Sequence, residues 1–78
     1  MKFVHFLMQE YNLGEKSARD YVGRFNRLVE RGIYNGEFRI TPGIEAAIEK
    51  DYESCKSHYI LALERYIAFR EKLISEIL

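Results

Sequence analysis

Hydrophobic residues recur at spacings of three and four along most of the chain, and this spacing predicts four helices. We expect the helices over residues 2–12, 15–31, 42–52 and 57–77. The second segment is the most regular, because its apolar positions all fall on one side of a helical wheel: Ala18, Tyr21, Val22, Phe25, Leu28 and Val29. The pattern therefore predicts an all-α fold in which residues 1–78 form a single small bundle of about four helices.

The apolar positions of the other short helices are the next candidates for the core. The first helix offers Phe3, Val4, Leu7, Met8 and Tyr11, and the third offers Ile44, Ala47, Ile48 and Tyr52. Residues with known preferences mark the helix ends. Leu13-Gly14 ends the first helix, Gly14 can cap the second and Gly32 can stop it, while Thr41-Pro42 is a strong helix start.

Two segments between the helices leave alternatives open. In residues 33–40, Asn35-Gly36 lies between β-prone residues, which predicts either a small hairpin or a structured turn. Residues 51–57 are polar, so we expect a break there between the third and fourth helices, although one long bent helix would also fit the pattern.

The last helix is apolar around about half of its circumference, which is more than three short helices need to cover. Either it is the central helix of the bundle, or part of it is an interface with another protein. The candidate protein-interaction residues on this helix are Leu61, Ile67, Arg70, Ile74 and Ile77.

The charges cancel in total but not along the chain. Twelve basic residues balance twelve acidic ones. Residues 15–31 contain five basic side chains against three acidic ones, a balance of +2, whereas residues 37–53 contain two against five, a balance of −3. The basic residues of the second helix are Lys16, Arg19, Arg24, Arg27 and Arg31. Three of these arginines share a stripe that could contact successive phosphates, although a solvated helix face would look the same.

The remaining chemistry of the chain favours a binding protein over an enzyme. Asp51, Cys55 and His58 are spaced like a nucleophilic set on one helix, but no glycine-rich turn lies nearby to supply an oxyanion hole. Nothing places His5 with His58 at a metal. We therefore expect no catalysis, no cofactor, no metal site and no small-molecule substrate.

Cysteine content and hydropathy indicate the compartment. Cys55 is the only cysteine, so a disulfide within the chain and a cysteine-rich zinc site are both excluded. No apolar run approaches the length of a membrane span. We expect a cytoplasmic protein that does not enter membranes.

Two stretches resemble the SAM-like core-binding domain that precedes the catalytic domain of tyrosine recombinases, or phage integrases. The first is Leu13-Gly-Glu-Lys-Ser-Ala-Arg-Asp-Tyr21 followed by Phe25 and Leu28, and the second is Ala62-Leu-Glu-Arg-Tyr-Ile-Ala-Phe69. The resemblance implies a four-helix domain that clamps duplex DNA with basic helix faces. By position, Lys16, Arg19, Arg24, Arg27 and Arg31 would make those contacts. The recombinase's catalytic half has no counterpart here, so the resemblance implies a stand-alone module without strand cutting.

These observations lead to two hypotheses of function. The first is a non-enzymatic accessory or regulatory protein, of a phage or other mobile element, that binds duplex DNA. The alternative is a protein-interaction module, for example a small inhibitor of a nucleic-acid-processing enzyme, which uses the apolar last helix or the acidic third helix. A homodimer fits either hypothesis, because a thin core and a wide apolar helix favour pairing.

Overall fold

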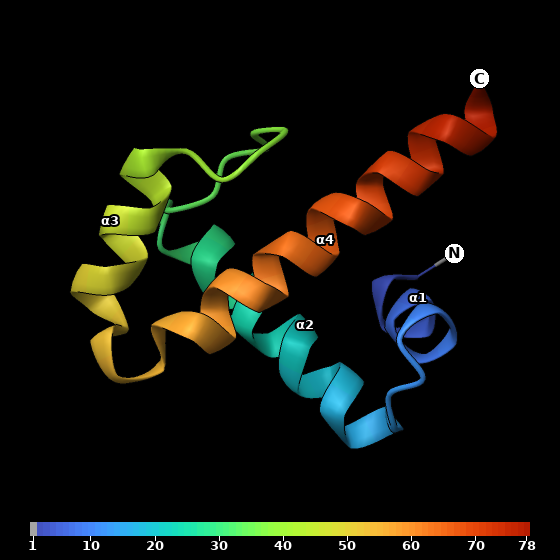
Figure 1. Ribbon diagram of the computed structural model, residues 1–78, viewed down its shortest axis with the longest axis horizontal. Coiled ribbons are helices and arrows are strands. Elements are labelled where there is room, and N and C mark those ends of the chain that lie inside the picture. Colours follow the sequence, from blue (N-terminus) through green and yellow to red (C-terminus); the bar gives the residue numbers. More distant parts are fainter. Residues whose placement is uncertain (1) are drawn as a thin grey trace.

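The computed structural model describes residues 2–78, and its regular elements are helices. These are α1 (Phe3–Glu10), α2 (Glu15–Glu30), α3 (Pro42–Asp51) and α4 (Lys56–Ile77), with a single 3₁₀ turn, η1 (Glu53–Cys55), between α3 and α4. The prediction of a small all-α bundle of four helices is confirmed. In Figure 1, α4 runs diagonally across the molecule, with α3 beside its N-terminal end, and α2 crosses behind it.

Helix α4 is the central element of the bundle, because it packs against α1, α2 and α3. The largest buried cluster joins α2, the following loop, α3 and α4, and its members are Leu28, Tyr34, Ile44, Ile48, Tyr59 and Leu63. This position explains much of the wide apolar arc of α4, since different sides of the helix face different neighbours. Among residues 2–78, no helix has both the length and the apolar character needed to cross a membrane.

Aromatic side chains fill the space between α1, α2 and α4. The rings of Phe25 and Tyr66 stack with centroids 3.9 Å apart, and Phe3 meets both of them edge-on. Phe6 is buried beside Phe69, with their ring centroids 5.2 Å apart. Phe6 is not among the apolar positions that the spacing pattern singled out in the first helix. It is buried because α1 contacts both α2 and α4, and so buries two of its sides.

The helices end where backbone geometry requires it. Helix α1 stops at Glu10, slightly earlier than predicted, and Asn12 follows with a φ of 53° in the left-handed region that asparagine tolerates. Gly32, with a φ of 71°, ends α2 in a Schellman motif: its N–H donates to the carbonyl of Val29, and the N–H of Ile33 donates to that of Leu28. The Thr41 side chain accepts a hydrogen bond from the N–H of Ile44 and caps α3.

The loop over residues 33–40 is a structured turn, and the hairpin alternative is wrong. Tyr34 turns into the core, where its hydroxyl donates to the Glu37 carbonyl at 2.7 Å and accepts from the Arg70 guanidinium at 3.1 Å. Arg70 also donates to the carbonyl of Gly36, whose φ of 92° suits only glycine. Side chains thus satisfy the backbone groups that a hairpin would have paired across two strands.

The predicted break between the third and fourth helices is confirmed, and one long bent helix is excluded. Tyr52 leaves the helical region, with φ of −134° and ψ of 43°, and Cys55 adopts a similar conformation just before α4 begins. The break turns α4 back along α3, and stacks the ring of Tyr52 on that of Tyr59 with centroids 3.8 Å apart.

Candidate nucleic-acid interface

Helix α2 presents a basic row on the side that faces away from the core. Ala18 and Leu28 are its fully buried side chains, whereas Lys16, Arg19, Arg27 and Arg31 are exposed. Lys16, Arg24, Arg27 and Arg31 follow one another at helical spacings of eight, three and four, so they form one row roughly 22 Å long. Arg24 is half-buried within the row.

Two arginines of this row contact tyrosines that lie outside α2, one after α3 and one on α4. An Arg27 N–H donates to the Tyr59 hydroxyl at 3.3 Å, and this hydrogen bond is the main cause that raises the pKa of Arg27 above its usual value. The Arg31 guanidinium lies 5.6 Å from the ring centre of Tyr52. Because Tyr52 and Tyr59 stack on each other, the four side chains form one unit, which we name the arginine–tyrosine cluster.

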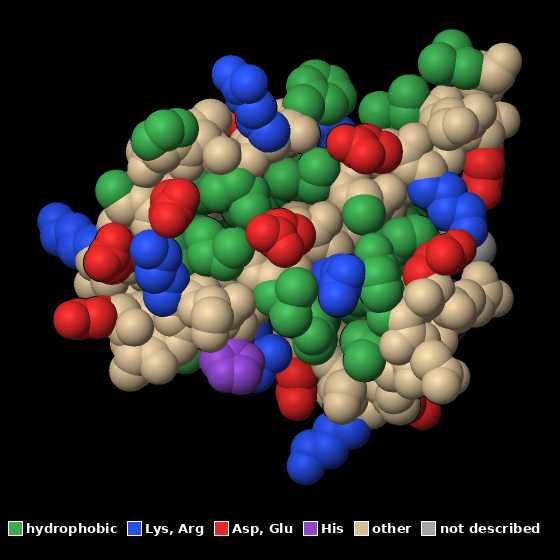
Figure 2. Space-filling model, viewed as in Figure 1, with side chains coloured by type: hydrophobic (Ala, Val, Ile, Leu, Met, Phe, Trp, Pro, Cys, Tyr) green, Lys and Arg blue, Asp and Glu red, His purple; other side chains and the backbone are tan. Residues whose placement is uncertain are grey.

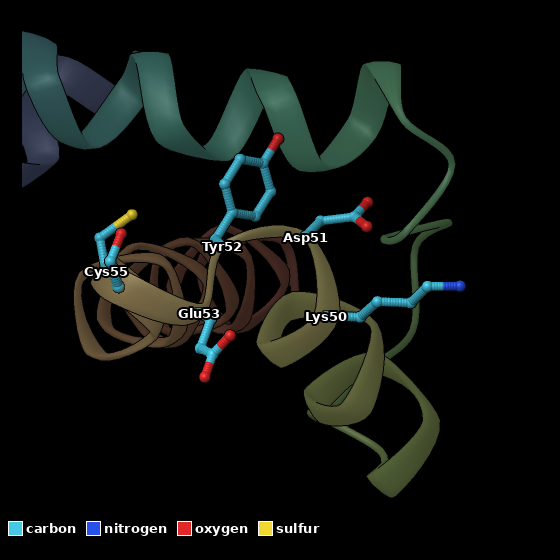
Figure 3. Close-up of a pocket in the computed structure, with 6 residues that line it drawn as sticks. Lys50, Asp51, Tyr52, Glu53 and Cys55 are labelled. Carbon is cyan, nitrogen blue, oxygen red and sulfur yellow. The ribbon is translucent and has the colours of Figure 1, made fainter.

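The cluster leaves most of the arginine donors available to a ligand. A guanidinium carries five N–H donors. The Arg27 guanidinium makes one hydrogen bond, to Tyr59, and that of Arg31 makes one, to the Asp51 carboxylate at 3.5 Å. Figure 3 shows Tyr52 pointing toward α2 from the turn that follows α3, with Asp51 beside it at the end of α3. The remaining N–H groups can donate to an anion such as a phosphate, with the positions of both guanidinium groups already restricted.

The other predicted nucleic-acid contacts lie along the rest of α2 and are less constrained. Arg19 forms an exposed ion pair with Glu15 at 2.7 Å, one turn away on the same helix. Arg24 lies 5.9 Å from the ring centre of Tyr21, also on α2. Asp20 lies in the row between Lys16 and Arg24 and reduces its positive charge. The structure therefore brings Arg27 and Arg31 together and leaves Lys16 and Arg19 toward the other end of the helix.

Sequence reasoning missed the two tyrosines of the cluster. Tyr52 was expected in the core, as an apolar position of the third helix, and Tyr59 is one of several apolar residues of the fourth. Their spacing of seven suggests a shared face only on a continuous helix, and the chain breaks between them. Their stacking therefore follows from the angle between α3 and α4, which the local pattern does not contain.

The five predicted protein-interaction residues of α4 do not form one surface. Ile67 packs partly against the main core cluster and Leu61 is half-buried. Arg70 is directed at the 33–40 loop, where it also lies over the ring of Phe38. Ile74 and Ile77 are exposed to 40% and 83%, on the last turns of α4 that project past the other helices in Figure 1.

The candidate nucleophilic set is not assembled. Asp51 belongs to α3 and Cys55 to η1, and Figure 3 shows their side chains on opposite sides of Tyr52. His58 is exposed on the first turn of α4. An open depression of about 640 Å³ is lined by residues 50–55. Within residues 2–78, no group of three His, Cys, Asp or Glu side chains is arranged to hold a metal ion.

Comparison with known proteins identifies no relative. No protein-family model matches the chain, and neither a curated protein nor a solved structure matches it significantly. The likeness to the core-binding domain of tyrosine recombinases stays a hypothesis based on the two stretches quoted above.

Proposed function

We propose that the protein binds duplex DNA through the outer side of α2 and acts as a non-enzymatic accessory or regulatory protein. The observation that carries this proposal is the arginine–tyrosine cluster, in which Arg27 and Arg31 are held side by side at one end of a basic row. Guanidinium groups are well suited to phosphate because their donors are planar and can bind two oxygens at once. Pre-positioned donors also lose less conformational entropy when they bind.

Two of the acidic side chains of α3 are directed away from the same surface. On α3, the carboxylates of Glu45 and Glu49 form ion pairs with the Nζ of Lys56 on α4, at 3.3 and 3.4 Å, and not with the arginines of α2. The row on α2 contains arginines and lysine but no pattern of side chains that reads base edges. Phosphate contacts would then dominate, and such binding weakens steeply as salt rises and depends little on DNA sequence.

The test is fluorescence anisotropy with a labelled duplex of about 20 base pairs, titrated at several salt concentrations. The wild-type protein should bind at low salt, with a logarithm of affinity that falls linearly with the logarithm of salt concentration. The triple variant Arg24→Gln, Arg27→Gln, Arg31→Gln should bind roughly a hundredfold more weakly, which is about 0.9 kcal/mol for each of three solvent-exposed contacts and lies within the usual net contribution of about 0.5–1.5 kcal/mol for a hydrogen bond. Its salt slope should fall by roughly 2 to 3, at about 0.9 for each lost phosphate contact.

A matched control removes the same number of positive charges elsewhere. Lys2, Arg39 and Lys50 are exposed and lie outside α2, so the triple variant Lys2→Gln, Arg39→Gln, Lys50→Gln has the same net charge as the test variant. This control variant should keep most of the wild-type affinity for the duplex. Far-UV circular dichroism on both variants establishes that the fold is retained. Equal loss in the two variants would mean that total charge, and not the α2 row, governs binding, and no binding by the wild-type at low salt would refute the proposal.

Removing the carboxylate of Asp51 should strengthen DNA binding. Asp51 lies beside Arg31 at 3.5 Å, where it occupies a donor and would repel an approaching phosphate. We expect the variant Asp51→Asn to bind the same duplex a fewfold more tightly, because exposed ion pairs contribute only about 0.2–1 kcal/mol. The variant Glu53→Gln, an exposed neighbour without an ion pair in residues 2–78, is the control and should bind like the wild-type at the same ionic strength. Unchanged or weaker binding by Asp51→Asn would show that phosphate does not approach Arg31.

A further inference from the structure

Helix α4 separates its positive charges from its negative charges. Arg65 lies 3.8 Å from the ring centre of Tyr11, and its buried Nε atom faces the protein. Lys72 pairs with Glu10 at the end of α1. Arg70 is bound to the 33–40 loop. The basic side chains of the second half of α4 are therefore turned toward the rest of the molecule.

Acidic side chains of α4 face solvent. Glu64 and Glu71 are exposed, and neither forms an ion pair or a side-chain hydrogen bond within residues 2–78. They alternate with three isoleucines at spacings of four and three, so that all five side chains follow one stripe along the helix. We name this stripe the α4 seam: Ile60, Glu64, Ile67, Glu71 and Ile74. Ile60 and Ile67 are half-buried and Ile74 is exposed.

The N-terminal end of the seam opens into a groove between α3 and α4. The groove has a volume of about 440 Å³, and its apolar lining residues are Ile60 and Leu61. Its polar lining residues are Glu45, Lys56, Ser57 and Glu64. Figure 2 shows hydrophobic side chains gathered along the middle of the visible face, with both acidic and basic side chains among them.

The surface made by the seam and the groove is negatively charged. Glu45, Glu64 and Glu71 contribute three carboxylates, and Lys56 contributes one ammonium group, which gives a balance of −2. The ammonium group is already shared between Glu45 and Glu49, so it offers little attraction to an incoming carboxylate. A stripe in which apolar side chains alternate with carboxylates is complementary to a helix that carries apolar side chains at spacings of three and four with Lys or Arg beside them.

We propose that the α4 seam and its groove form a docking site for a basic amphipathic helix of another protein. The apolar anchors of that helix would cover Ile60, Leu61 and Ile67, and its basic side chains would pair with Glu64 and Glu71. A second copy of this chain does not suit the site. Pairing of two α4 helices in either direction places the glutamates of one seam close to those of the other, which is unfavourable. This inference is independent of DNA binding, since it concerns a different helix and the opposite charge.

The experiment uses two synthetic amphipathic peptides with leucine at helical spacings of three and four. One carries lysine at its polar positions and the other carries glutamate. The basic peptide is titrated into the full chain, and binding is followed by NMR shifts of the isoleucine and leucine methyl groups. We expect the basic peptide to bind, with the largest shifts at Ile60, Leu61 and Ile67, and the acidic peptide not to bind.

Charge reversal tests the surface directly. The variant Glu64→Lys, Glu71→Lys should bind the basic peptide at least roughly tenfold more weakly and should gain binding of the acidic peptide, a gain that misfolding cannot produce. The control Glu30→Lys, Glu76→Lys makes the same change of charge at exposed sites outside the seam and should keep the wild-type preference. Three results would each overturn the proposal. They are equal effects of the two double variants on peptide binding, methyl shifts centred on α2, and a concentration-dependent dimer of the wild-type, seen in sedimentation, that covers the seam.

Discussion

Replacing Phe6 with alanine should lower the free energy of unfolding by about 3–5 kcal/mol, the usual cost of removing a buried aromatic side chain. Phe6 is 3% exposed and joins α1 to α4 through the ring of Phe69, and its other edge meets Tyr11 at 5.8 Å. A domain of this length has a total stability of roughly 4–12 kcal/mol. The variant should therefore be partly unfolded, as measured by urea denaturation with far-UV circular dichroism.

The neighbouring variant His5→Ala is the control for Phe6→Ala. His5 is exposed on the same helix, so its loss should change the unfolding free energy by no more than about 0.5 kcal/mol. Amide hydrogen exchange adds a second readout. If α1 is held mainly by Phe6, its amides should lose protection before those of α3. Equal stability of the two variants would contradict the placement of α1 between α2 and α4.

Replacing Leu28 with alanine should lower the free energy of unfolding by about 2–5 kcal/mol. Leu28 is fully buried at the centre of the main cluster, where α2, the 33–40 loop, α3 and α4 meet. Alanine would leave a cavity that the surrounding helices can close only in part. The measurement is again chemical denaturation, with the slope of the transition used to check that the native state has not expanded.

The adjacent residue supplies the control for Leu28→Ala. Val29 is 47% exposed on the same turn of α2. Val29→Ala should be nearly neutral, within about 0.5 kcal/mol, because little packing is lost and alanine has the higher helix propensity. A large loss in Val29→Ala with a small one in Leu28→Ala would mean that α2 is rotated about its axis. Such a rotation would also move Arg27 and Arg31 away from the tyrosines.

The core and the proposed DNA-binding surface are therefore linked through α2. Leu28 lies between Arg27 and Val29 in the chain, and its carbonyl accepts the hydrogen bonds that end the helix. Because Leu28 is buried in the core, α2 has a fixed rotation about its axis. This rotation orients Arg27 toward Tyr59 and brings the end of α2 beside Asp51. Stability variants of the core should consequently be compared with the wild-type at a temperature where both are folded before DNA binding is measured.

Local sequence determined the helices, because their signals are short-range. The spacing of apolar residues predicted α2 and α4 to within a residue at each end, and Gly32 and Thr41-Pro42 marked the boundaries by their own backbone preferences. The polar stretch after Asp51 predicted the break before α4 in the same way. The basic character of α2 is likewise readable from composition alone.

Only the tertiary structure decided which of these residues meet. Phe6 is buried because α1 is covered on two sides, and the 33–40 loop is a turn because Arg70, more than thirty residues away, binds its carbonyl groups. The stacking of Tyr52 on Tyr59, and their contacts with Arg27 and Arg31, depend on the angle between α3 and α4. Helical periodicity specifies the face on which a side chain lies, but the partner of that face depends on how the helices pack, and that packing is a property of the whole chain.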